Sequence, residues 1–141
     1  MEKKEVRYKR YRDKINYIVN HLENLPPHAE TPLERSATFY DLHTSIEAAI
    51  DLVAMYLKDQ GELVDDDYNN LDKLAEFGVT SKLISLLKEA NGLRNHLVHR
   101  YNSFDEIIAL NSILRIKKGL YKWIEIVEGF LHDAGFEPDS E

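Results

Sequence analysis

Apolar residues recur along most of this chain at the three- and four-residue spacing of amphipathic helices. Over residues 2 to about 24 this pattern predicts a first helix, which ends before Pro26 and Pro27. Residues 31–34 read Thr-Pro-Leu-Glu, a helix start with threonine as N-cap, proline at the first helical position and a glutamate that completes a capping box. We expect a long second helix from there to about Asp59, with Gly61 as its C-terminal stop.

The second half of the chain continues the helical pattern. A short helix over residues 68–77 should end at Gly78, and a further helix capped by Thr80 should run to about Tyr101. Residues 103–106, Ser-Phe-Asp-Glu, form another capping box. From there we expect a short helix, a break near residues 111–112 and a long helix that ends near Asp133. No segment alternates with the period of a strand, so the predicted fold is all-α, with five to six helices.

Length, charge and composition narrow the class of protein. At 141 residues the chain fits one domain, expected over residues 1–135 and followed by a short tail, residues 136–141. Because it has no cysteine, thiol catalysis, cysteine-based zinc sites and disulfides are excluded. Residues 1–7 lack an apolar stretch and no run of about 18 apolar residues occurs, so we expect a soluble, cytoplasmic protein with no membrane contact. The net charge of −7 argues against general electrostatic coating of nucleic acid, although residues 3–14 form a local basic face.

Two carboxylates interrupt the apolar face of the second predicted helix. Glu47 and Asp51 lie one turn apart, a spacing that can serve acid–base chemistry or hold a metal ion. Most such pairs are solvated surface charges, and the sequence leaves both interpretations open. His21 and His43 carry no accompanying pattern and are expected to be ordinary surface residues.

The chemically richest stretch is residues 93–101, Leu-Arg-Asn-His-Leu-Val-His-Arg-Tyr. Each residue of a helix advances by about 100°, so Arg94 and Tyr101 point almost the same way, while Asn95 and His99 share an adjacent face. Leucines four residues apart in the same stretch continue the apolar stripe of the preceding helix and should anchor the segment in the core. The polar groups are therefore expected on a rigid, partly buried helix.

Three kinds of chemistry fit these polar groups. A metal site would use His96 and His99, but their three-residue spacing differs from the four-residue spacing of a zinc-protease helix, and we expect no metal. A structural role would have the histidines hydrogen-bonded inside a helical interface. The third is metal-independent phosphodiester cleavage, in which a histidine takes the proton of a ribose 2′-hydroxyl and Arg94 stabilises the charge on the phosphate. Because cleavage needs both a base and an acid, a two-fold dimer would complete the set.

Arg94 followed directly by Asn95, then His99 and Tyr101, resembles the signature of HEPN-domain proteins, specifically the HepT-type toxins. The similarity extends by pattern over residues 5–131 and includes the stretch Ile-Glu-Ala-Ala-Ile-Asp-Leu-Val at residues 46–53. The resemblance implies an up-and-down helical bundle and a homodimer whose two motifs line one cleft.

The resemblance also implies a function and a partner. Members of this family act as metal-independent endoribonucleases on RNA and are the toxins of toxin–antitoxin pairs, with no cofactor. The antitoxin is a minimal nucleotidyltransferase, thought to silence the toxin by transferring AMP to the motif tyrosine. Carried over residue by residue, Arg94 holds the phosphate, His99 is the general acid–base, Asn95 assists and Tyr101 is the modification site, whereas His96 occupies a variable position. Two alternatives remain: a non-catalytic nucleotide-binding subunit of a two-component nucleotidyltransferase, and a helical dimerisation module.

Overall fold

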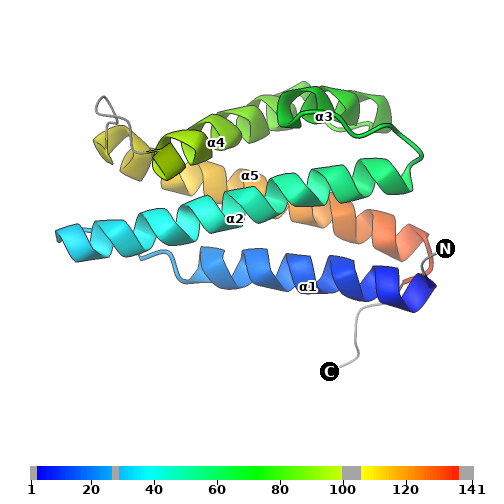
Figure 1. The fold of residues 1–141 in the computed structure, drawn as a ribbon, viewed down its shortest axis with the longest axis horizontal. Helices are drawn as coiled ribbons and strands as arrows, with labels where there is room; N and C mark the ends of the chain where they lie inside the picture. The colour runs from blue at the N-terminus through cyan, green and yellow to red at the C-terminus, as the bar shows by residue number, and fades with distance from the viewer. Residues whose placement is uncertain (1–2, 27–28, 100–105, 137–141) are drawn as a thin grey trace.

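All regular structure in the described part of the chain is helical. The computed structural model describes residues 3–26, 29–99 and 106–136, and at His99 only the backbone. Figure 1 shows the helices in chain order, which are α1 (Lys4–Glu23), α2 (Pro32–Asp59), α3 (Asp67–Lys73), the short 3₁₀ helix η1 (Leu74–Phe77), α4 (Ser81–His99) and α5 (Glu106–Asp133). The predicted all-α class is confirmed, and the element order follows the expected one.

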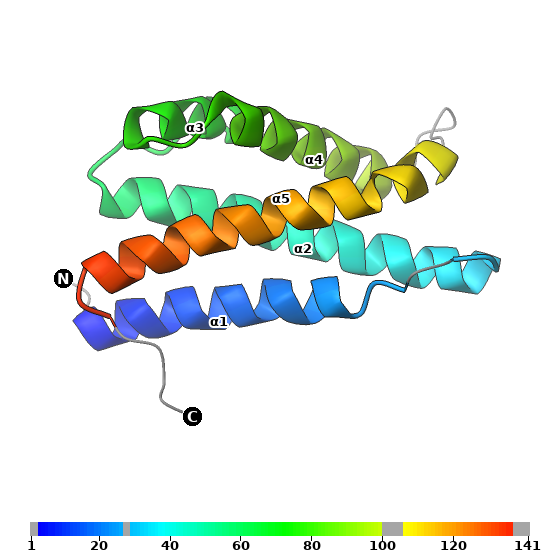
Figure 2. The same ribbon diagram turned by 180° about the vertical axis from the view of Figure 1, so that it is seen from behind.

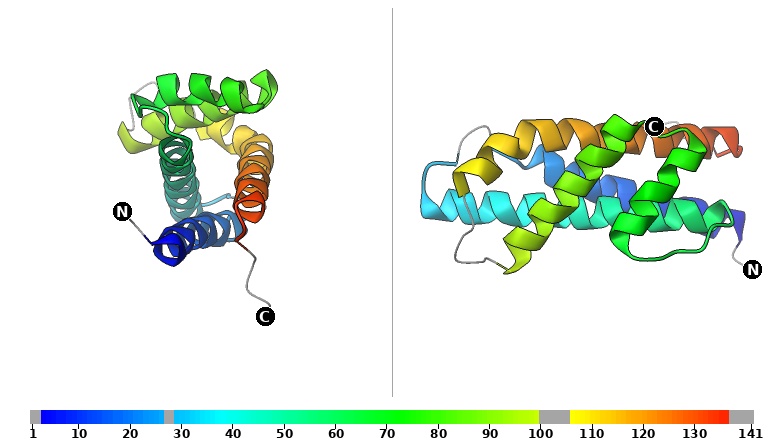
Figure 3. Two further views of the ribbon diagram at one scale, coloured as in Figure 1. Left: turned by 90° about the vertical axis from the view of Figure 1, so that its right-hand side faces the viewer. Right: turned by 90° about the horizontal axis from the view of Figure 1, so that it is seen from above.

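The long helices run up and down and enclose one core. Helices α1 and α2 form an antiparallel pair, and α5 runs along the other side of α1 (Figures 1 and 2). Seen from the end of the bundle, α3 and α4 form a layer that closes the space between α2 and α5 (Figure 3). The C-terminal end of α4 and the N-terminal ends of α2 and α5 lie at the same end of the molecule (Figure 1).

Several helix boundaries lie where the sequence predicts them. At the start of α2 the backbone N–H of Thr31 donates to Glu34 Oε1 at 2.9 Å, and the Glu34 N–H donates to Thr31 Oγ1 at 3.1 Å. Hydrogen bonding of the Glu34 carboxylate to Thr31, first to its backbone N–H, lowers the pKa of that carboxyl because it favours the charged form. Gly61 and Gly78 adopt φ of 84° and 87°, a left-handed conformation that glycine adopts without steric cost.

The expected break near residues 111–112 is wrong, because α5 continues from Glu106 to Asp133 without interruption. The Ser112 hydroxyl donates to the carbonyl of Ile108, one turn earlier, at 2.8 Å. The serine hydroxyl thus finds its acceptor within the helix and does not displace the backbone hydrogen bonds of α5. Residues 103–105 of the expected capping box lie outside the described residues.

The core is tied together by aromatic side chains from α2 and α5. Trp123 is fully buried, and its indole N–H donates to the carbonyl of Ala49 at 3.2 Å. The Tyr56 ring meets Trp123 edge-on with ring centroids 5.7 Å apart. Phe136, beyond the expected domain boundary at residue 135, stacks on Tyr8 with centroids 4.8 Å apart and planes within 5°.

None of the helices in the three described ranges combines the length and apolar character needed to cross a membrane.

Close packing of α4 on α5 predicts opposite effects of alanine at two glycines of α5. A Cβ at Gly119 would lie 2.1 Å from Leu86 Cδ2 and 2.9 Å from its Cγ, whereas a Cβ at Gly129 would meet nothing within 4 Å. We expect Gly129→Ala to raise the free energy of unfolding by about 0.5–1 kcal/mol through helix propensity. Gly119→Ala should lower it by about 1–2 kcal/mol, because overpacking outweighs that gain. Urea unfolding measures both, and equal stabilisation would contradict the described packing.

The link between α1 and the end of α2 predicts a loss of stability at alkaline pH. Tyr11 is 1% exposed and donates its hydroxyl to the Asp59 carboxylate. Burial, and then the adjacent carboxylate, raise the pKa of Tyr11 above its ordinary value near 10. As the pH rises, the unfolded chain therefore loses the Tyr11 proton before the folded protein does, which favours unfolding. The contribution of this tyrosine to the free energy of unfolding is complete below pH 10 and falls as the pH rises further. Urea unfolding between pH 9 and 11 should show that the free energy of unfolding declines less for Tyr11→Phe than for Tyr17→Phe. Tyr17 serves as the control because its ring, on the same helix, is 45% exposed.

Candidate active site

Helix α4 positions the central polar motif. Thr80 caps the helix by accepting the N–H of Leu83 at 3.2 Å, as the sequence predicts. Apolar side chains on the inner face of α4 anchor it in the core, namely Leu83, Ile84, Leu87, Ala90 and Leu97. The polar residues between them are thus held on an element whose position is fixed by packing, as precise chemistry requires.

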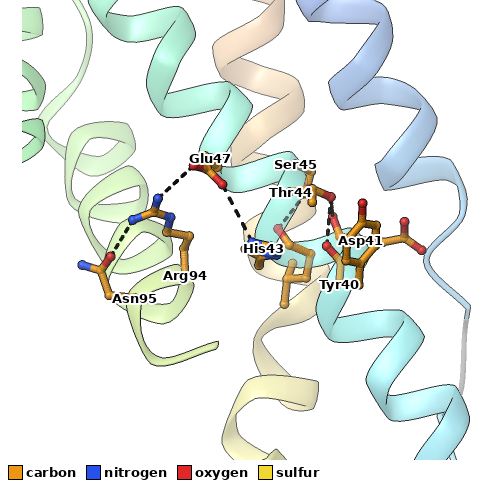
Figure 4. Close-up of polar contacts among 9 residues, drawn as sticks. Tyr40, Asp41, His43, Thr44, Ser45, Glu47, Arg94 and Asn95 are labelled. Carbon is orange, nitrogen blue, oxygen red and sulfur yellow. Dashed lines mark hydrogen bonds and ion pairs between the residues drawn. The ribbon is translucent and has the colours of Figure 1, made fainter. Parts of the chain in front are cut away.

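Arg94 extends from α4 to α2 (Figure 4). One terminal nitrogen of its guanidinium donates to Asn95 Oδ1 at 2.8 Å, and the other donates to Glu47 Oε1 at 3.1 Å. The arginine side chain is 26% exposed, and its Nε is buried without a hydrogen-bond partner among the described residues. Buried donors are normally hydrogen-bonded, so this N–H stands out among the described residues.

The two carboxylate oxygens of Glu47 face two different side chains, those of Arg94 and His43. While Oε1 accepts from Arg94, Oε2 lies 3.8 Å from Nε2 of His43, one turn earlier on α2 (Figure 4). The His43 side chain is 26% exposed and that of Glu47 is 47% exposed. The site therefore includes His43, which the sequence interpretation treated as an ordinary surface residue, beside Glu47, whose role that interpretation left open. Their four-residue spacing was the available signal, since it places both on one helix face.

The carboxylate pair suggested by the sequence has two separate sets of contacts. Glu47 contacts Arg94, whereas Asp51 lies 3.5 Å from Nζ of Lys14 on α1. Nothing in these contacts joins the two carboxylates into a single metal or acid–base site. Among the described side chains there is also no cluster of three or more groups suited to holding a metal ion.

Two of the predicted site residues cannot be placed. His99 is the last residue of α4, and its side chain lies outside what the structure describes, as does all of Tyr101. Arg94 and Asn95 are brought into direct contact, while His96 is exposed on the same helix. The expected approach of Arg94 to His99 therefore stays a prediction.

The basic face of α1 is largely balanced by neighbouring carboxylates. Lys9 pairs with Asp13 at 2.7 Å, and Lys14 pairs with Asp51. A groove of about 600 Å³ between α1 and α2 is lined by both signs of charge, with Arg10 and Lys14 facing three carboxylates that include Glu47. Such a lining does not create the uniformly positive path that nucleic acid favours.

The expectation that His21 is a surface residue is wrong. Its Nδ1 lies 2.7 Å from Asp41 Oδ1, and the two side chains are only 18% and 17% exposed. The rings of Tyr17 and Tyr40 meet the imidazole edge-on, with centroids 4.5 and 6.0 Å away. This cluster ties α1 to α2, and the ring of Tyr40 in turn meets that of His43 edge-on, with centroids 6.0 Å apart.

The fold and the site define an all-helical bundle that presents an arginine and an amide near the end of its fourth helix. The family model described as "Ribonuclease HepT-like" matches residues 10–126, a segment that contains Arg94, Asn95 and His99. This chain belongs to the HepT-like ribonuclease family.

Individual relatives agree with this assignment. A protein of Archaeoglobus fulgidus named "Putative RNase" is 47% identical over 127 residues, covering 89% of this chain and 96% of the relative. A second protein of that organism with the same name is 36% identical over 102 residues, covering 71% of this chain and 77% of the relative. The fold is similar to a chain in a crystal structure of a mutant toxin–antitoxin MntA-HpeT, with a TM-score of 0.73 at 16% identity over 84% of this chain and 98% of that chain.

Proposed function

We propose that this protein is a toxin of a toxin–antitoxin pair and cleaves RNA without a metal ion. The family assignment and the names of the relatives support ribonuclease activity. The structural observation that carries the proposal is Arg94, which is held by Asn95 and Glu47, is 26% exposed and has a further N–H on each terminal nitrogen. A planar guanidinium with spare donors matches the geometry of a phosphate.

In the proposed reaction the ribose 2′-oxygen attacks the adjacent phosphorus, and the bond from phosphorus to the 5′-oxygen breaks. His99 takes the proton from the 2′-hydroxyl, and the products are a 2′,3′-cyclic phosphate and a free 5′-hydroxyl. Arg94 stabilises the negative charge that builds up on the phosphate oxygens, with Asn95 fixing one end of the guanidinium. The leaving oxygen receives its proton from the His99 of a second copy of the chain.

A homodimer is part of this proposal, because one copy supplies one motif. Exposed apolar residues at the end of the bundle that carries the motif support an interface there: Leu33 is 80% exposed, Leu114 79% and Val98 47%. The ion pair of Arg35 with Glu106 at 3.3 Å joins α2 to the start of α5 at this end. Two copies that meet there would place their α4 helices close together.

We further propose that a minimal nucleotidyltransferase silences the toxin by transferring AMP to Tyr101. The similarity of the fold to a chain from a toxin–antitoxin complex supports such a partner. Attachment at Tyr101, two residues after His99, would add a bulky anion beside the phosphate-binding arginine. Like-charge repulsion and steric exclusion of RNA would then follow.

The nuclease proposal predicts histidine-dependent cleavage in EDTA. Purified protein, unmodified at Tyr101, should cleave a labelled RNA, and His99→Ala should reduce the rate by about 10²–10⁴-fold, the usual contribution of general acid–base catalysis. The mutant should keep its helical content and its sedimentation as a dimer. Equal residual cleavage by both proteins would indicate contamination and favour the nucleotide-binding alternative.

The silencing proposal predicts a covalent change at a single tyrosine. Incubation with ATP and the partner nucleotidyltransferase should add the mass of AMP to this protein and abolish RNA cleavage. Tyr101→Phe should remain unmodified and active under the same conditions, as read by mass spectrometry of the intact chain. Modification of Tyr101→Phe to the same extent would place the target elsewhere.

A further inference from the structure

We propose that Glu47 of α2 is a positioning residue of the active site, which holds the guanidinium of Arg94 in a fixed plane for the scissile phosphate. The inference extends the proposed ribonuclease function and rests on it for the identity of the phosphate. It adds a residue of α2 to a site whose sequence motif lies within residues 94–101.

The argument begins with the hydrogen-bonding capacity of arginine. A guanidinium has five N–H groups in one plane. Asn95 takes one from the first terminal nitrogen, and Glu47 takes one from the second. Two anchors on different nitrogens fix the plane of the group, while the second N–H of each terminal nitrogen keeps capacity for phosphate oxygens.

The two anchors come from different directions, which makes both of them necessary. Asn95 is the next residue on the same helix, so its amide restrains the guanidinium from the side of α4 alone. Glu47 is attached to α2, where the residues on either side of it, Ile46 and Ala48, are buried. The contact at 3.1 Å therefore sets the position of the guanidinium against the core (Figure 4).

Glu47 is itself oriented on both sides. Its Oε2 faces Nε2 of His43 at 3.8 Å, so that each carboxylate oxygen faces a nitrogen of a different side chain. A carboxylate restrained in this way loses little further freedom when RNA arrives. The cost of ordering the long arginine side chain is met during folding, and preorganisation of this kind favours the transition state.

Asp51 provides a matched comparison within the same helix. It carries the same charge one turn further on and is 59% exposed, but its partner is Lys14 of α1. Removing its charge changes the electrostatics of the α1–α2 groove without touching Arg94. A general effect of acidic residues on RNA binding would therefore appear at both positions, and a positioning effect only at Glu47.

The first test compares the turnover of RNA by Glu47→Ala, Glu47→Gln and Asp51→Asn in EDTA. Glu47→Ala should lower kcat about 10–100-fold with a smaller change in KM, since a displaced guanidinium fails chiefly in the transition state. Glutamine retains an oxygen that can accept from Arg94, so Glu47→Gln should stay within about threefold of wild type. Asp51→Asn should be unchanged. Faster turnover or a lower KM in both Glu47 variants would overturn the proposal, because the carboxylate would then act as a competitor of the phosphate.

The second test is independent of catalysis. In ¹⁵N-labelled protein the Nε–H signal of Arg94, assigned by its loss in Arg94→Lys, should be protected from solvent exchange in the wild type, Glu47→Gln and Asp51→Asn. It should broaden or exchange rapidly in Glu47→Ala, while thermal unfolding shows that the variant remains folded. An unchanged signal in Glu47→Ala would refute the positioning role. Should the wild type prove unable to cleave RNA, the ribonuclease proposal fails, and this measurement still decides whether Glu47 holds Arg94.

Discussion

The side chain of Arg94 lies between α4 and α2 and is only 26% exposed. Its positive charge therefore has to be compensated by neighbouring groups of the protein. A partly buried cation without partners is costly, and water alone cannot solvate this one fully. The amide oxygen of Asn95 and the carboxylate of Glu47 supply the compensation, and the contact with Glu47 requires the two helices to keep their present register. The arrangement of α4 over α2 and the geometry of the site are therefore aspects of one constraint.

Packing in the rest of the bundle holds α4 in its position against α2. Leucines, one isoleucine and one alanine on the inner face of α4 hold it against α2 and α5, and the close contact of Leu86 with Gly119 allows little sliding between α4 and α5. The indole of Trp123 is bonded to the carbonyl of Ala49, which lies two residues after Glu47. The apolar core thus fixes the backbone on both sides of the ion pair, and the exposed ends of the side chains remain for binding.

The sequence predicted those features of the fold that depend on neighbouring residues. The capping box at Thr31 and the glycine stop at Gly78 are set by interactions over a few residues, so their patterns are reliable. The expected break at Ser112 failed because serine can also bond one turn back within a helix, a choice that local pattern does not decide. His21 was misjudged for a different reason: its partner, Asp41, lies on another helix and becomes a neighbour only after folding.

The same distinction applies to the site. Arg94 and Asn95 stand out in the sequence because they are adjacent in a short motif, whereas Glu47 lies 47 residues away and reaches Arg94 only through the packing of α4 on α2.

The fixed position of Arg94 bears on how a chain of net charge −7 would recognise RNA. Two lysines of α1, Lys9 and Lys14, are already paired with carboxylates, which reduces the positive charge that α1 offers to phosphates. In the proposed ribonuclease, affinity would then rest on a small number of directed contacts that include the guanidinium of Arg94, and orientation of that one group would matter more than the overall electrostatic field.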